Sequence, residues 1–154
     1  PKMKSIILDM DGTFVSLYDV PNWLPKLRAY DPSPYVEAAP LVSMNVLARH
    51  LNRLSAKGYK LGIVSWGSKS TGNSEADANY LGATRQAKQK WVARHLKSVH
   101  FDSFEVVPYG TPKSTVCPFY GEDAILFDDD ERNRAEWGEM AFSEKELFEV
   151  LRML

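Results

Sequence analysis

The chain has 154 residues, of which 44% are hydrophobic and 25% are charged. This length predicts one compact domain, and the composition excludes a disordered, collagen-like or coiled-coil chain. No apolar run approaches the ~20 residues that span a bilayer, and the first residues lack the apolar stretch of a secretory signal. The single cysteine, Cys117, can form neither an intramolecular disulfide nor a zinc cluster, so we expect a cytoplasmic protein.

The net charge of −1 conceals an uneven distribution along the chain. Residues 41–100 carry 10 basic and 2 acidic side chains, a net charge of +8. Residues 101–154 carry 5 basic and 13 acidic side chains, a net charge of −8. A basic segment can mark a surface for an anionic partner, but we favour the interpretation that the two segments neutralise each other within one fold.

In chain order, three short apolar runs predict buried strands. The runs and the polar residues that follow them are 5–8 with Asp9, 61–64 with Ser65, and 124–127 with Asp128. Continuous apolarity is typical of parallel strands that are covered on both faces. Residues 104–107 are a weaker strand prediction, and residues 138–142 are a candidate for a short edge strand.

Helical patterns lie between these runs. An apolar stripe covers residues 44–54, and Gly58 follows it as a stop signal. A second stripe covers residues 87–99, and the prediction places its basic residues on the other faces of that helix: Lys88, Lys90, Arg94 and Lys97. Ser143 and Glu146 form a capping box that begins a last helix. The order of elements predicts an α/β fold, a three-layer α/β/α Rossmann-like parallel sheet.

Two irregular stretches interrupt this pattern within a single domain of residues 1–154. Residues 14–40 contain five of the nine prolines, and residues 66–84 are rich in Gly, Ser, Asn and Asp and predict a polar loop. Long ordered loops in compact domains are often functional. The segment Gly67-Ser68-Lys69-Ser70 resembles a P-loop but does not match its motif, which excludes nucleotide binding of that kind.

The polar residues at the strand ends predict a functional site. In an open parallel sheet, ligands bind beyond the carboxyl ends of the strands, where Asp9, Ser65 and Asp128 would meet. Asp11 follows Asp9 by two residues, and Gly12 permits the tight turn. Crowded carboxylates repel one another unless a cation joins them, and hard oxygen ligands favour Mg²⁺. A magnesium site in turn indicates a phosphate, or another hard oxyanion, as substrate.

Four motifs resemble those of the haloacid dehalogenase (HAD) superfamily of aspartate-nucleophile phosphohydrolases. Asp9-Met10-Asp11-Gly12-Thr13 resembles the first motif, and Ser65 at a strand end resembles the second. Asp128-Asp129 with Asn133 resembles the fourth. Lys113 fits the third, a lysine near a helix start, with Thr111 as N-cap and Pro112 at the first helical position; Lys88 and Lys90 are alternatives. The motifs follow family order over residues 5–137.

The resemblance implies a Mg²⁺-dependent phosphomonoester hydrolase that forms an aspartyl-phosphate intermediate. Asp9 would be the nucleophile, and Asp11 would be the general acid and then the general base. Mg²⁺ would be held by Asp9, Asp128 and the backbone carbonyl of Asp11. The phosphoryl group would be bound by Ser65, by Lys113 and by the segments Gly12-Thr13 and Trp66-Gly67. Asp129 would orient Lys113 or a water molecule bound to the metal. Asn133 would likewise support the metal ligands without binding the metal itself.

Two narrower resemblances concern the substrate. Segment 58–66 and the polar residues after it are similar to the phosphatase domain of bacteriophage-type polynucleotide kinase/3′-phosphatases. The Lys90-Trp91-Val92 helix and the Ile-Leu-Phe-Asp-Asp segment are similar to small 5′(3′)-deoxyribonucleotidases. Residues 14–40 are too few for a full cap domain of this family and predict a small lid. These resemblances imply a nucleotide or nucleic-acid end phosphate as substrate, which the basic segment 41–100 also fits.

Other functions stay open at this point. The chain could be a phosphatase of a small metabolite or of a phosphoprotein, or a non-catalytic binding module with a HAD fold. We expect a phosphorylated small molecule or a nucleic-acid end as partner, and no membrane. The sequence leaves the oligomeric state undetermined.

Overall fold

The computed structural model describes residues 3–154 and has a five-stranded parallel sheet at its centre. The strand order is β5-β4-β1-β6-β7, and every neighbouring pair is parallel. The strands are β1 (Ser5–Leu8), β4 (Lys60–Trp66), β5 (Ser103–Val107), β6 (Ala124–Phe127) and β7 (Ala141–Phe142). All five lie where the apolar runs predict them, although β7 is shorter than the predicted segment.

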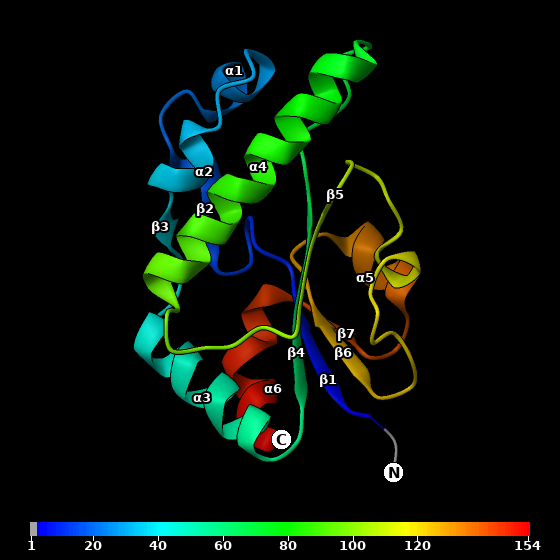
Figure 1. Cartoon of the computed structure of the whole chain (residues 1–154). Coiled ribbons are helices and arrows are strands. Elements are labelled where there is room, and N and C mark those ends of the chain that lie inside the picture. The colour runs from blue at the N-terminus through cyan, green and yellow to red at the C-terminus, as the bar shows by residue number, and fades with distance from the viewer. Residues whose placement is uncertain (1–2) are drawn as a thin grey trace.

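Helices cover both faces of this sheet (Figure 1). On one face lie α3 (Met44–Ala56), α4 (Ser74–His95) and α6 (Leu147–Met153), and on the other lies α5 (Glu131–Trp137). Side chains alternate along a strand, so Ile6 and Leu8 pack with α3 and α6 while Ile7 packs with Trp137 of α5. The predicted three-layer α/β/α fold is therefore confirmed. Among residues 3–154, no helix has the length and apolarity needed to cross a membrane.

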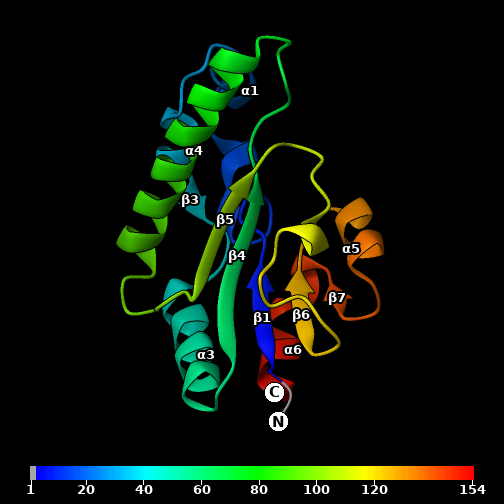
Figure 2. The ribbon, with the colours of Figure 1, turned by 45° about the vertical axis from the view of Figure 1, so that its right-hand side comes forward.

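The carboxyl ends of the strands meet at one edge of the sheet. Leu8 pairs in register with Ile63 and Phe127, and β4 continues past this level to Trp66. An insert of residues 15–40 lies beyond the edge (Figure 2). The insert consists of β2 (Val15–Ser16), a 3-10 helix (η1, Leu17–Asp19), α1 (Trp23–Arg28), α2 (Ser33–Glu37) and β3 (Ala39–Pro40), with β2 antiparallel to β3.

Two side chains of α4 donate hydrogen bonds to backbone carbonyls of the insert. The indole nitrogen of Trp91 donates to the carbonyl of Ala38 over 2.7 Å, and the Tyr80 hydroxyl donates to the carbonyl of Asp31 over 2.8 Å. Both hydrogen bonds come from α4, which thus holds the insert above the strand ends, where a ligand would bind.

The structure corrects three predictions for α4. Residues 74–84 are helical, although we predicted a polar loop over 66–84, because Asn73 caps the helix by accepting a hydrogen bond from Ala76 N. The helix ends at His95, so Val99 lies beyond it. Lys88 is only 1% exposed, and its placement on an outer face with Lys90 was wrong.

Two further predictions concern helix starts. Lys113 begins a short 3-10 helix (η2, Lys113–Thr115), and Pro112 precedes it, so the prediction of Thr111 as cap and Pro112 as first helical residue was wrong. The capping box of Ser143 and Glu146 is confirmed at a 3-10 turn (η3, Glu144–Glu146) that leads into α6.

Candidate active site

Asp9 directly follows β1 and begins a tight turn. Its backbone nitrogen donates to Phe127 O over 3.0 Å, which continues the sheet pairing to this residue. The Thr13 hydroxyl donates to Asp9 Oδ2 over 2.9 Å and closes the turn. Gly12 has φ +83°, and a Cβ added there would collide with the Asp129 carboxylate. The glycine therefore serves both the turn and the approach of Asp129.

Lys113 joins two strand ends. Its ammonium donates to Asp9 Oδ1 over 2.8 Å and to Asp128 Oδ2 over 2.7 Å. Asp128 directly follows β6, and its second oxygen accepts from Asp130 N over 2.9 Å. Lys113 has no exposed surface, so this ammonium is held entirely by the two carboxylates.

A second lysine, Lys88, reaches the site from α4. Its ammonium donates to Asp11 Oδ2 over 2.8 Å, to Ser65 Oγ over 2.6 Å and to the Trp66 carbonyl over 2.8 Å. The sequence offers Lys88 as an alternative to Lys113 for the lysine of the third motif, but both lysines lie in the site. Each of them contacts a different carboxylate of the Asp9-Met10-Asp11 turn.

The two carboxylates of that turn have opposite pKa shifts. Burial raises the pKa of Asp9, but the Lys113 charge and the hydrogen bonds from Lys113 and Thr13 outweigh it and hold this pKa below its ordinary value. Burial also raises the pKa of Asp11, and here the neighbouring Lys88 does not fully oppose the effect, so the pKa stays above its ordinary value. Such a pair is what acid–base and nucleophilic roles require.

Three carboxylates form a candidate metal site. One oxygen from each of Asp9, Asp128 and Asp129 lies within 4.8 Å of the others. Burial and the Asp9 charge raise the pKa of Asp128 to about 6. Burial and a hydrogen bond to Asp9 raise the pKa of Asp129 to about 8. Crowded carboxylates of this kind fit Mg²⁺, which relieves their repulsion. Asp129 thus stands among the candidate ligands, whereas the sequence placed it behind them.

A cavity of about 620 Å³ opens over these groups. Asp9, Asp11, Asp128 and Asn133 line one end of it, and Ser65, Lys88 and Lys113 are buried directly behind the three carboxylates. Trp66 and Gly67, which the sequence proposes as phosphoryl-binding residues, line the wall, and the loop after them continues the wall to Thr71. In the turn formed by Gly12 and Thr13, the Thr13 hydroxyl donates to Asp9 and accepts a hydrogen bond from the Asp129 backbone nitrogen.

Several side chains of the cavity were not foreseen from the sequence. The insert contributes Tyr18, Trp23 and Tyr35, and β5 is followed by Tyr109. For Lys88 a signal was present: Tyr80, Thr84, Lys88 and Trp91 share one helix face by their spacing, and all are buried. The aromatic residues gave no comparable signal, because their positions depend on how the insert folds over the edge.

Comparisons with known proteins agree with this architecture. No protein-family model matches the sequence, and no curated protein matches it. A chain of the Pnkp1/Rnl/Hen1 complex has the same fold with a TM-score of 0.58 at 16% identity over 92% of this chain and 46% of that chain. A second structure, of the Pnkp1/Rnl/Hen1 RNA repair complex, gives a TM-score of 0.56 at 16% identity over 92% and 42% of the two chains.

A third similar structure is the D,D-heptose 1,7-bisphosphate phosphatase from Burkholderia thailandensis. It gives a TM-score of 0.51 at 15% identity, over 89% of this chain and 73% of that chain. The present chain spans less than half the length of the two chains from the Pnkp1/Rnl/Hen1 assemblies. These likenesses support the HAD-like fold that the sequence motifs predict.

Proposed function

We propose that this chain is a Mg²⁺-dependent phosphomonoester hydrolase that acts through an aspartyl-phosphate on a nucleotide or nucleic-acid end phosphate. The observation that carries the proposal is the Asp9-Met10-Asp11 turn at the carboxylate-lined end of the cavity. It combines one carboxylate of lowered pKa with one carboxyl group of raised pKa. The first suits a nucleophile at neutral pH, and the second suits a proton donor.

The reaction would proceed in two steps. An Asp9 oxygen attacks phosphorus, the bond from phosphorus to the ester oxygen breaks, and Asp11 gives its proton to that leaving oxygen. In the second step, Asp11 takes a proton from a water molecule as the water attacks the phosphorus of the aspartyl-phosphate. The Asp9 carboxylate leaves, inorganic phosphate is released and Asp11 is protonated again.

Positioning and charge neutralisation would do the rest of the catalytic work. Asp9, Asp128 and the Asp11 carbonyl would hold Mg²⁺, and Asp129 lies close enough to join them. The ion would neutralise charge on the phosphoryl oxygens. Lys113 donates to Asp9 and Lys88 donates to Asp11. Each ammonium would also contact the phosphoryl group of the substrate. Ser65 is held by Lys88 at the end of β4 and would bind a phosphoryl oxygen.

The substrate class rests on the cavity walls and on the similar structures. Tyr18, Trp23 and Tyr35 give the side facing the insert an aromatic surface that suits a nucleobase or sugar. One of the similar structures belongs to an RNA repair complex. The basic segment 41–100 supports the proposal less than we expected, because Lys88 is buried and Lys69 alone among its lysines and arginines lines this cavity.

Hydrolysis of p-nitrophenyl phosphate, with and without Mg²⁺, tests the proposed reaction. We expect Mg²⁺-dependent turnover in the wild type and a loss of at least about a thousandfold in kcat for Asp9→Asn. Circular dichroism shows whether the variant is folded. A panel of nucleotides and sugar phosphates then tests the substrate class. A folded Asp9→Asn protein with near wild-type turnover would contradict the reaction, and a preference for sugar phosphates would contradict the substrate class.

A further inference from the structure

A cluster of aromatic and basic side chains lies beside the catalytic carboxylates. We call Trp66, Lys69, Tyr109 and Arg132 the aromatic-cationic rim. The rings of Trp66 and Tyr109 are 4.8 Å apart between centroids and are tilted by 55°. The four residues come from the end of β4, the loop after it, the segment after β5 and the start of α5. Two strand ends and a helix thus converge on one surface.

The rim begins at the catalytic centre. The Lys113 ammonium, which is bound to Asp9, lies 5.9 Å from the centroid of the Trp66 ring. The indole nitrogen of Trp66 donates to the Thr111 carbonyl over 2.8 Å, which fixes the orientation of the ring. A substrate whose phosphoryl group is at Asp9 would therefore have its next part within reach of Trp66 and Tyr109.

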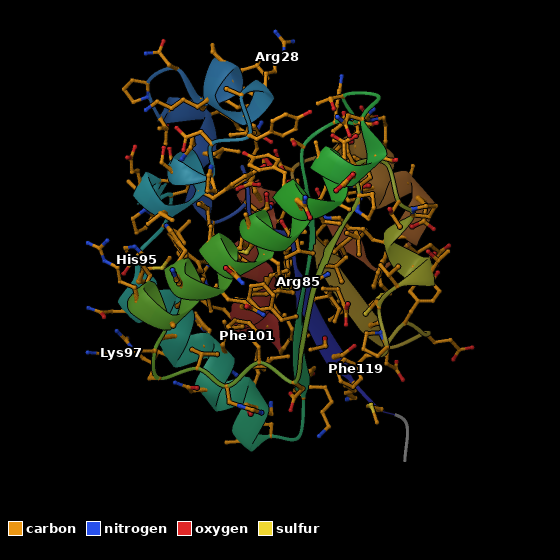
Figure 3. All side chains as sticks on the ribbon, turned by 45° about the horizontal axis from the view of Figure 1, so that its top comes forward. Arg28, Arg85, His95, Lys97, Phe101 and Phe119 are labelled. Atoms are coloured by element: carbon orange, nitrogen blue, oxygen red, sulfur yellow. The ribbon has the colours of Figure 1, made fainter. Side chains whose placement is uncertain are left out.

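The rim also carries cations. The Lys69 ammonium lies 5.2 Å from the Tyr109 ring centroid, and Arg132 lies 5.8 Å from the Trp66 centroid and donates to the Tyr109 hydroxyl over 3.1 Å. Arg132 is paired with Asp130, whereas Lys69 is exposed and has no acidic partner among the described residues. Arg28 of α1, labelled in Figure 3, lines the same cavity from the insert and likewise has no such partner in residues 3–154.

From this arrangement we infer that the rim binds the strand of a single-stranded nucleic acid, so that the substrate is the phosphorylated end of a polymer. Aromatic faces that stack bases, with cations that meet backbone phosphates, are how proteins bind single strands without sequence preference. A mononucleotide has no phosphate besides the one at Asp9, so it offers no anion to Lys69 and Arg28. This inference rests on the proposed phosphomonoesterase function.

The first experiment compares substrates of different length. Thymidine tetranucleotides with a terminal phosphate at the 5′ or the 3′ end are compared with the matching thymidine monophosphates. For one of the two ends, kcat/KM should be about tenfold or more above that of the mononucleotide. Normalised to p-nitrophenyl phosphate, this advantage should fall to about twofold or less in a Tyr109→Ala/Lys69→Ala double variant.

Lys97→Ala is the matched control for the lysine change. Lys97 is exposed beyond the C-terminal end of α4, far from Arg28 (Figure 3), and it does not line the cavity, so its loss should leave the advantage unchanged. The tetranucleotide rate should also fall with salt more steeply than the mononucleotide rate. Equal kcat/KM for tetranucleotides and mononucleotides, or an advantage that survives in the double variant, would overturn the inference.

A binding measurement separates this inference from the proposed reaction. Fluorescein-labelled decathymidylate without a terminal phosphate should bind the wild type, with a Kd raised about tenfold in Tyr109→Ala. If p-nitrophenyl phosphate is hydrolysed but neither strand binding nor a length advantage is seen, the rim inference fails and the reaction stands. If the strand binds through Tyr109 but no phosphate ester is hydrolysed, strand binding by the rim stands and the proposed reaction fails.

Discussion

Two buried lysines divide the carboxylates of the site between them. Lys113 holds Asp9 and Asp128, and Lys88 holds Asp11. An isolated buried charge is costly, so each ammonium requires its carboxylate partners, and each partner is stabilised in its charged form in return. Lys113 thereby keeps the proposed nucleophile ionised, whereas Lys88 limits how far the pKa of the proposed acid rises. The two lysines should therefore affect activity in different ways.

Replacing Lys88 with glutamine tests this division. The Lys88 charge lowers the pKa of Asp11 against the effect of burial, so its removal raises that pKa further. Since the first step needs protonated Asp11, the alkaline limb of kcat/KM for p-nitrophenyl phosphate should move to higher pH. Lys90→Gln, at an exposed neighbouring position, should leave the limb in place. An alkaline limb that stays or moves to lower pH in Lys88→Gln would refute the assignment of Asp11 as the acid.

Asp128 and Asp130 should differ in their effect on the metal. Asp128 is 1% exposed and lies among the candidate ligands, whereas Asp130 caps α5 and pairs with Arg132. By calorimetric titration, Asp128→Ala should weaken Mg²⁺ binding by about tenfold or more, and Asp130→Ala should change it by about twofold or less. The Asp130 variant should instead lose about 1 kcal/mol of stability with its helix cap. Similar losses of Mg²⁺ affinity in both variants would show that the ligands are misassigned.

Most of the fold could be predicted because its strands are buried on both faces. The runs 6–8, 61–64 and 124–127 within β1, β4 and β6 contain no polar side chain, and this pattern is hard to mistake. The first half of α4 was missed for a physical reason. It buries Tyr80 and Thr84 against the insert, and apart from Leu81 its other residues are small or polar, so its apolar stripe is too sparse to stand out.

The site could be predicted in part for the same reason. Asp9, Ser65 and Asp128 lie at strand ends, and their meeting follows from the topology alone. The position of Lys88 depends on the rotation of a helix whose start was misplaced. The aromatic wall of Tyr18 and Trp23 depends on the packing of a 3-10 helix against α1, which no local pattern encodes.

The loop from residue 67 to residue 73 is an element whose order depends on α4. Asp77 of α4 accepts hydrogen bonds from Ser70 Oγ over 2.9 Å and from Thr71 N over 3.0 Å. Thr71 Oγ1 is also 2.7 Å from the Tyr30 hydroxyl of the insert, so this loop closes one side of the cavity mouth. Its position therefore depends on the half-buried Asp77 carboxylate together with the Tyr30 hydroxyl.

Asp77→Ala should loosen this loop without harming the chemistry. Amide hydrogen exchange of residues 68–72 should become faster, and KM for the nucleotide substrate should rise several-fold while kcat stays the same. Glu75→Ala removes an acidic residue from the same first turn of α4 and should leave both quantities unchanged. Unchanged exchange in Asp77→Ala would mean that the loop is held by other contacts.

Across the whole molecule, the basic and acidic segments are not joined by a network of ion pairs. Among residues 3–154, the contact between His100 and Asp102, at 3.7 Å, joins the two segments directly. Lys88 and Lys113 instead pair with three buried carboxylates of the site, those of Asp9, Asp11 and Asp128. The buried ion pairs of residues 3–154 are therefore concentrated at the candidate metal site.

Without metal, this concentration of carboxylates should make stability depend on pH. The folded-state pKa of Asp129 is about 8, against 3.8 for the ordinary side chain. The folded protein then binds the proton more tightly than the unfolded chain, and stability falls as pH rises between these values. In EDTA, the Tm of Asp129→Asn relative to wild type should therefore be higher at about pH 9 than at about pH 5.

Asp130→Asn is the matched control for this measurement. The hydrogen bonds from Arg132 lower the pKa of Asp130, so its charge stabilises the folded state above that pKa, and the variant should lose Tm at neutral and alkaline pH. Mg²⁺ should reduce the difference between wild type and Asp129→Asn at high pH. A pH-independent difference for Asp129→Asn would contradict the proposed crowding of carboxylates.

The covalent step at Asp9 is the central claim, and chemical trapping tests it most directly. The protein is mixed with p-nitrophenyl phosphate and Mg²⁺, quenched during turnover and treated with borohydride, which reduces an acyl phosphate to an alcohol. Peptide mass spectrometry should then find homoserine in place of aspartate at position 9, and only when substrate and Mg²⁺ are both present. Continued turnover with unmodified Asp9, or with the modification at another carboxylate, would contradict the account.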